Sequence, residues 1–190
     1  MTFDFAAARQ NMVDCQVRTS DVTDRAIHEA MLSVERERLV PADRAAVAYA
    51  DAEVPCGAGR FLMRPREVGK LLQAVRPRSG ERAIAIAAPY AAAVLEAMGL
   101  LVDRLDEGDL TALSGGLYDV AICEGAVSAA PDAWIACLRL GGRLGVVERN
   151  GPVGKAKLYV NADTGIGVLE VFDATPPMLP GFERAAQFTF

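Results

Sequence analysis

Apolar residues in the first part of the chain recur at helical spacing. They predict two helices within residues 4–40 and a third that begins at Pro65, where the missing N–H of proline costs nothing. Thr23 is placed to cap the second helix. The stretch between the second and third helices, residues 42–64, lacks a clear period, and residues 54–61 (VPCGAGRF) are predicted to form a loop.

From residue 81 onward, strand and helix patterns alternate. Strands are predicted at 82–87, 100–105, 117–123 and 143–148, and a hairpin at 156–160 and 167–172. Helices are predicted at 90–98 and from Pro131 to Leu138, the latter ended by Gly141-Gly142. This order predicts an α/β fold with a mainly parallel sheet and one antiparallel corner. We interpret residues 1–190 as one domain, with a helical region at 1–80 and a sheet region at 81–190.

Composition and charge exclude several classes of protein. The 190 residues are 52% hydrophobic and 24% charged, which excludes a disordered chain. No apolar run is long enough for a membrane span, and no basic stripe accompanies the net charge of −5, so neither a membrane nor a nucleic-acid partner is expected. Because the N-terminus does not resemble a secretory signal, we expect a cytoplasmic protein.

The cysteines and the one histidine do not indicate a metal site. Cys15, Cys56, Cys123 and Cys137 lack the spacing of zinc or thioredoxin motifs, and three of them stand among apolar neighbours. His28 is interpreted as a residue on a helix surface. Reduced cysteines and no bound metal are therefore expected.

The turn after the first predicted strand raises the question of a cofactor. A strand followed directly by a helix is typical of nucleotide-binding folds, in which glycines line the turn. Here the turn reads Ala87-Ala88-Pro89, and no glycine occurs between Gly80 and Gly99. Alanine disfavours the positive φ of such a turn, and proline removes one N–H donor.

Four stretches, taken in order, resemble the protein-L-isoaspartate O-methyltransferases. They are RQNMVDCQVRTSDVTDRAIHEAMLSVERERLVP, AYADAEVPCGAGRFLMRP, GERAIAI and YDVAICEGAVSAAPDAWIACLRLGGRLGVV. The resemblance implies a Rossmann-like class I methyltransferase fold. It also implies binding of S-adenosylmethionine and methylation of the carboxylate of isoaspartyl residues in damaged proteins.

The resemblance also implies that the sheet is shortened. Residues 88–118, 31 in number, separate the strands that match the family's first and fourth strands. This length accommodates one helix, one strand and a short connection, so about one βα unit is missing. The strand at 100–105 matches either the second or the third strand of the family.

Candidate site residues follow from the resemblance. Ala87 and Ala88 stand where the cofactor loop begins. Asp106 would hold the ribose if the strand at 100–105 is the family's second, whereas Asp109 would lie near the adenine if it is the third. Met63 occupies the position of a substrate-binding serine, and the neighbouring Arg64 could pair with a carboxylate. No catalytic residue is assigned.

Two hypotheses follow for the function. One is an active methyltransferase that acts on isoaspartyl residues. The other, which the altered cofactor loop and substrate position favour, is a non-catalytic relative with weak or absent S-adenosylmethionine binding that acts as a scaffold or binds a protein partner. Because loss of a helix would uncover an apolar flank of the sheet, we expect a homodimer or a protein partner to cover it.

Overall fold

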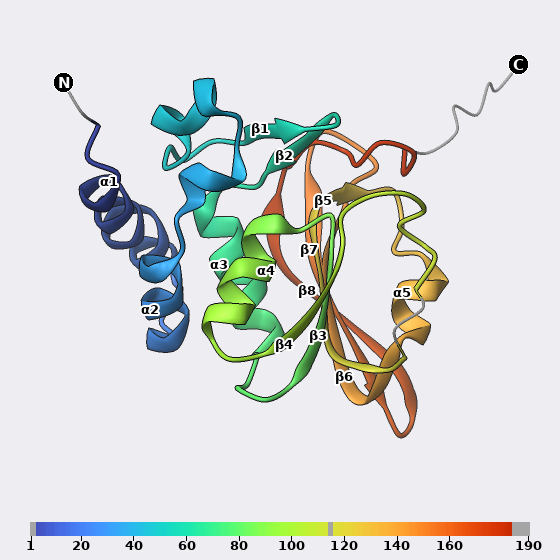
Figure 1. Ribbon diagram of the computed structural model, residues 1–190. Helices are drawn as coiled ribbons and strands as arrows, with labels where there is room; N and C mark the ends of the chain where they lie inside the picture. Colours follow the sequence, from blue (N-terminus) through green and yellow to red (C-terminus); the bar gives the residue numbers. More distant parts are fainter. Residues whose placement is uncertain (1–2, 114–115, 184–190) are drawn as a thin grey trace, which may run out of the picture.

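A six-stranded sheet organises the chain in the computed structural model, which describes residues 3–113 and 116–183 (Figure 1). Its strands are β3 (Arg82–Ile86), β4 (Leu101–Leu105), β5 (Tyr118–Val127), β6 (Leu138–Glu148), β7 (Gly154–Ala162) and β8 (Gly165–Ala174). They lie in the order β4-β3-β5-β6-β7-β8. The first four are parallel, and β7 and β8 are antiparallel additions at one edge. The predicted parallel sheet and terminal hairpin are confirmed.

The position of β4 settles which strand of the doubly wound order it represents. β4 pairs with β3 on the side away from β5. In the doubly wound order 3-2-1-4-5-6, the second strand flanks the first on the side away from the fourth. β4 therefore takes the place of the second strand. Among residues 87–113 and 116–117, β4 is the one strand between β3 and β5, which confirms the shortening. Asp106 therefore follows the strand whose end carries the ribose-binding acid in related folds.

Helices cover both faces of the sheet unequally. They are α1 (Phe5–Met12), α2 (Arg25–Ser33), α3 (Pro65–Val75), α4 (Pro89–Ala97) and α5 (Asp132–Ala136). Shorter helical segments are Val13–Val17, Arg18–Ser20, Arg36–Leu39 and Ala42–Val47. Helices α3 and α4 pack on one face with α1 and α2 outside them, and α5 lies on the other face (Figure 1). The core accordingly has two parts, one on each side of the sheet.

Residues 42–64 contain more regular structure than predicted. The expected loop at 54–61 instead forms a small antiparallel hairpin of β1 (Val54–Gly57) and β2 (Arg60–Leu62). Its turn has positive φ at Gly57, Ala58 and Gly59. The two glycines adopt this conformation without the steric strain that a Cβ would cause. The hairpin lies over the end of β5 (Figure 1). Such a short pair is held by its tertiary contacts, which the local pattern does not reveal.

The predicted boundary between α5 and β6 is wrong by several residues. The helix ends at Ala136, and Leu138 already pairs with Tyr118. The register between β5 and β6 then shifts so that residues 139–142 form a bulge. A Cβ on Gly142 would lie 2.8 Å from two backbone oxygens, so this glycine serves close packing of the bulge and does not end a helix.

Two local assignments in the N-terminal region also need correction. Asp24, and not Thr23, caps α2 by accepting from the N–H of Ala26 at 2.9 Å. Gln73 of α3 holds the Thr23 N–H instead, at 2.7 Å. His28 is not a surface residue, because it is 7% exposed and its Nε2 lies 2.8 Å from the Val22 carbonyl oxygen.

The turn from β3 to α4 keeps a left-handed residue although its glycine is absent. Ala87 has φ of +46° and is buried, and its N–H donates to the Leu105 carbonyl at 2.9 Å. Ala88 and Pro89 follow as the N-cap and the first residue of α4. The turn thus keeps a positive φ although alanine, as expected from the sequence, disfavours it. The surrounding structure imposes the conformation, which is strained for any residue with a Cβ.

Comparison of two alanine-to-glycine substitutions measures this strain. Ala85→Gly, in the middle of β3, and Ala87→Gly each remove one buried methyl group and each add backbone freedom to the unfolded chain. Only Ala87→Gly also relieves a left-handed alanine. We expect urea denaturation to show that Ala87→Gly lowers the free energy of unfolding by about 1–2 kcal/mol less than Ala85→Gly does. Equal losses in the two variants would contradict a strained turn.

Candidate functional site

The carboxyl ends of β3, β4 and β5 meet below the β1–β2 hairpin. In open α/β sheets, ligands bind outside these ends. The structure brings four elements to this edge: the β3–α4 turn with Ala87 and Ala88, the end of β4 with Asp106, the end of β5 with Glu124, and the segment from β2 into α3 with Met63. This edge is the candidate site.

Glu124 is the buried charge at the centre of the site. Its side chain is 1% exposed. One carboxylate oxygen accepts from the Ala91 N–H in the first turn of α4 at 2.6 Å, and the other accepts from the Met63 N–H at 3.3 Å. Helix N-termini favour anions because their first N–H groups have no partner within the helix. Glu124 thus supplies from within the chain the negative charge that the start of α4 attracts.

A bulge places Glu124 where it is. The pairing of β5 with β6 shifts between Ile122 and Ala126, and Gly125 within the shift has φ of +123°. A Cβ on Gly125 would approach Leu179 to 2.8 Å, so the chain passes closely under the C-terminal segment here. Bulges of this kind redirect a side chain at the end of a strand.

Arg36 holds the other side of the Met63 peptide. Its guanidinium is fully buried and donates to the carbonyls of Met63 at 2.6 Å and Ala48 at 2.7 Å. It also lies over the Tyr90 ring, 4.4 Å from the centroid. The Met63 backbone is therefore fixed between a buried cation and a buried carboxylate, through its carbonyl and its N–H respectively. This arrangement joins α4, the β2–α3 segment and β5 into one polar network.

Burial dominates the electrostatics of this network. It raises the pKa of Glu124, although the Ala91 N–H and Arg36 act in the opposite direction. Burial likewise raises the pKa of the half-buried Cys56 thiol, and the charge of Glu124 adds to this rise. Cys56 is therefore a thiol and not a reactive thiolate at neutral pH.

Three backbone positions at this edge offer no free N–H to a cofactor. The Ala87 N–H is bonded to β4, Pro89 has no N–H, and the Ala91 N–H is bonded to Glu124. A glycine-rich cofactor loop works because its N–H groups point freely at the ligand. For these three positions that condition is not met.

The two acidic candidates near β4 lie in different surroundings. Asp106 is 3.6 Å from Arg60 of the β1–β2 hairpin, measured from Oδ1 to Nη1. Asp109 is exposed and accepts from the N–H and hydroxyl of Thr111 at 2.8 and 2.6 Å, so it organises its own turn. The structure brings Asp106 to the site, where Arg60 already pairs with it, and leaves Asp109 as a turn residue.

The residues at the substrate position have structural partners. The Met63 side chain is fully buried in the core, so it does not face a binding surface. Arg64 pairs with Glu53, with 2.9 Å between Nε and Oε1. A carboxylate substrate would therefore have to compete with Glu53 for the guanidinium.

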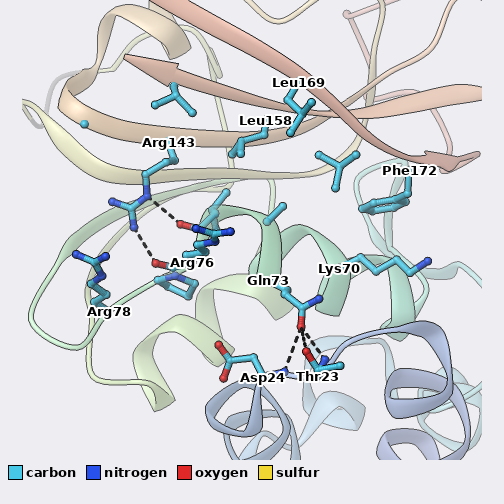
Figure 2. Close-up of a pocket in the computed structure, with 16 residues that line it drawn as sticks. Thr23, Asp24, Lys70, Gln73, Arg76, Arg78, Arg143, Leu158, Leu169 and Phe172 are labelled. Carbon is cyan, nitrogen blue, oxygen red and sulfur yellow. Dashed lines mark hydrogen bonds between the residues drawn. The ribbon is translucent and has the colours of Figure 1, made fainter. Parts of the chain in front are cut away.

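Two cavities lie away from this edge. A groove of about 1110 Å³ runs between α3 and the β7–β8 pair, and Figure 2 shows Gln73 and Lys70 on its helical side and Leu158 on its sheet side. A second, shallow pocket of about 360 Å³ lies beside Arg149 and Met178. Neither is lined by any of the candidate site residues. Within residues 3–113 and 116–183, no three His, Cys, Asp or Glu side chains are grouped to hold a metal ion.

Sequence reasoning missed Glu124 and Arg36. A signal for Glu124 existed, since it is the one charged residue in the apolar run from Val120 to Val127, and a charge in such a run is buried and needs partners. Arg36 stands among other charged residues in a helical pattern, and nothing local distinguishes it. Its role depends on contacts with Ala48 and Met63, 12 and 27 residues away in the chain.

The raised pKa of Glu124 gives a signed pH dependence. Its folded-state pKa lies above the ordinary 4.5, so its contribution to stability is complete below that value and is lost as the pH rises through the folded pKa. We expect the stability of the wild type relative to Glu124→Gln to fall as the pH rises above about 4.5 in urea denaturation.

Glu148→Gln is the matched control with the opposite sign. Burial of Glu148 acts to raise its pKa, but hydrogen bonds from Lys157, at 2.7 Å, and Tyr159 outweigh it and lower the pKa. The stability of the wild type relative to Glu148→Gln should therefore rise with pH below about 4.5 and then level off. The same sign for both variants would contradict the electrostatic description of Glu124.

Comparisons with known sequences place the chain in a family. A family model described as protein-L-isoaspartate(D-aspartate) O-methyltransferase matches residues 7–103, which is 97 of 190 residues. A protein-L-isoaspartate O-methyltransferase from Methylorubrum populi is 40% identical over 102 residues, covering 53% of this chain and 48% of the relative. One from Anaeromyxobacter is 39% identical over 89 residues, covering 46% and 37%. The matches span about half the length of these curated relatives or less.

Solved structures show the fold. A Plasmodium falciparum protein described as a protein-L-isoaspartate O-methyltransferase, in complex with S-adenosyl-L-homocysteine, superposes with a TM-score of 0.73 at 14% identity, covering 94% of this chain and 99% of that one. Another protein-L-isoaspartate O-methyltransferase gives 0.72 at 17% identity, covering 92% and 67%. In the described residues, no helix is long and apolar enough to cross a bilayer. The solved structures show that the fold is the Rossmann-like methyltransferase fold. With the match to the family model, the chain belongs to the protein-L-isoaspartate O-methyltransferase family.

Proposed function

We propose that this chain is a non-catalytic member of its family, which binds S-adenosylmethionine weakly or not at all and acts as a scaffold or a protein-binding subunit. The observation that carries the proposal is the Glu124 carboxylate at the N-terminus of α4. S-adenosylmethionine is itself an amino acid with a carboxylate. In this fold a cofactor reaches the same helix end, where Glu124 already accepts a hydrogen bond.

Displacing the Glu124 carboxylate from the start of α4 would cost a large amount of free energy. Its carboxylate would have to leave the N–H groups of Ala91 and Met63, and Arg36 would stay buried without that negative charge nearby. Breaking a buried charged arrangement by removing one member costs about 3–5 kcal/mol. Such a cost weakens ligand binding by about two to four orders of magnitude.

The remaining positions support the same proposal. The Ala87–Pro89 turn offers no free N–H at the positions described above, and Asp106 is paired with Arg60. At the substrate end, the buried Met63 side chain cannot donate a hydrogen bond to an isoaspartyl carboxylate. Loss of binding chemistry at both ends, with the fold preserved, favours a role that depends on shape and surface. The competing function is the carboxyl methylation after which the curated relatives are named.

Thermal denaturation with S-adenosylhomocysteine separates these functions. A ligand held only by the folded state adds about 2.7 kcal/mol at one hundred times its dissociation constant, which for a chain of this size raises Tm by about 5–10 °C. We expect a shift below about 1 °C at millimolar ligand, a concentration at which a functional site would be saturated. The Methylorubrum populi relative, treated identically, serves as the comparison protein.

A dose-dependent rise in Tm would contradict the proposal, and methyl transfer to an isoaspartyl peptide would then identify an active enzyme. Glu124→Ala tests the stated cause. If Glu124 blocks the helix end, this variant should gain a larger Tm shift with S-adenosylhomocysteine than the wild type shows. The shift is compared with the variant's own ligand-free Tm, so its lower stability does not affect the result.

A further inference from the structure

Strand β8 forms an unusually exposed edge of the sheet. It has ten residues, and no described strand pairs with its outer side. Apolar side chains on both of its faces are open to solvent: Ile166 at 45%, Val168 at 53%, Leu169 at 61% and Val171 at 40% exposure. The outward N–H and C=O groups of such a strand are free to pair with another strand.

The opposite edge of the sheet is protected in the usual ways. β4 has only five residues and carries Asp103 and Arg104, which pair with Arg82 and Glu96. Edge strands are ordinarily short, charged or interrupted by proline. β8 contains no lysine, arginine or proline. Its protective features are Glu170, Asp173 and the bulge at Val171, which leaves the pairing from Gly165 to Glu170 regular.

One face of β8 also borders the large groove. Leu169 pairs with Leu158, so the two side chains share the face that α3 partly covers, and both line the groove together with Phe172 (Figure 2). Lys70 of α3 lies over the Phe172 ring, 5.3 Å from its centroid. The groove thus continues to the free edge of the sheet, where the next strand would extend its apolar floor.

We propose that β8 pairs with β8 of a second copy of this chain, in antiparallel orientation about a two-fold axis at Leu169. The two sheets then join into one sheet of twelve strands, because each copy contributes six. A two-fold pairing is closed, so it protects both free edges without forming a filament. The inference does not depend on whether the chain binds a cofactor.

Charge, pleat and apolar contact select the register. Paired residues of two joined sheets must lie on the same face, so the axis has to pass through a residue and not between two residues. An axis at Glu170 would place two carboxylates opposite each other, which is destabilising. An axis at Leu169 places an exposed leucine against its own copy, so the apolar floor that Leu158 and Leu169 form continues into the partner subunit, and Glu170 faces Val168 of the partner subunit.

A second copy fits this surface better than an acidic peptide attracted by the basic groove. Arg143, one of the four cations that line the groove, is already bonded to Glu81 at 2.9 Å and to the Val75 and Arg76 carbonyls at 2.9 Å each. The acidic residues of β8 lie on the other face of the sheet, where Glu170 is opposite Lys157 and Asp173 forms an ion pair with Lys155. The groove side of β8 is therefore apolar. Apolar contact and backbone pairing therefore dominate the surface, and β8 itself presents both.

Light scattering coupled to size-exclusion chromatography tests the proposal on the whole chain. We expect a dimer for the wild type. Leu169→Lys should raise the dimer dissociation constant at least about 100-fold, because two ammonium groups would meet at the axis. Leu101→Lys, at an equally exposed leucine on β4, is the matched control and should stay dimeric. Melting curves of both variants verify that each is folded.

Cysteine trapping tests the register. In a Cys15→Ser background, which removes the exposed native thiol, Leu169→Cys should form a disulfide-linked dimer on mild oxidation, because only a residue on the axis faces itself. Ile166→Cys lies away from the axis, so it does not face its own copy and should not crosslink. A monomer at all concentrations, including one that binds an acidic peptide, overturns the proposal. So does a dimer that Leu169→Lys leaves intact.

Discussion

The buried carboxylate of Glu124 connects elements that the sheet alone would leave independent. Through Ala91 it holds the start of α4, and through Met63 it holds the entry to α3. Arg36 binds the same Met63 peptide from the N-terminal region, so the helical region and the sheet share one buried network. Because removal of a partner from a buried charge is strongly destabilising, none of these segments can move separately without a large cost in free energy.

The network also explains how the fold persists with fewer elements. The sheet ends at β4 on one side, and the core on the α3–α4 face is completed by α1, α2 and the hairpin that precedes α3. The left-handed conformation of Ala87 fits the same explanation. Its backbone is held by Leu105 on β4 and by the start of α4, so the turn keeps a shape that its own residue disfavours.

Periodicity predicted the parallel strands, the terminal hairpin and the start of α3 at Pro65, because each depends on a regular local pattern. It failed where a bulge interrupts that pattern, at residues 139–142 and at Glu124, since a bulge changes which face a side chain meets. It failed also for Arg36, whose partners are remote in the chain. The candidate residues Ala87, Ala88 and Asp106 lie together at one edge of the sheet, but the hydrogen bond of Ala87 and the ion pair of Asp106 could not be inferred from residue types.

The two edges of the sheet, β4 and β8, differ in how many apolar side chains they expose. The edge shortened by the missing βα unit was expected to be the uncovered one, yet its charged residues pair along and across β4 and leave Leu101 as its isolated apolar side chain. The exposed apolar residues gather instead on β8, which extends beyond the cover of α3 and α5. If the proposed function and the proposed pairing of β8 both hold, a buried network stabilises one end of the sheet and the binding surface is the open strand at its far edge. Such a molecule would recognise a partner through backbone pairing and apolar contact, which require a stable sheet and no cofactor.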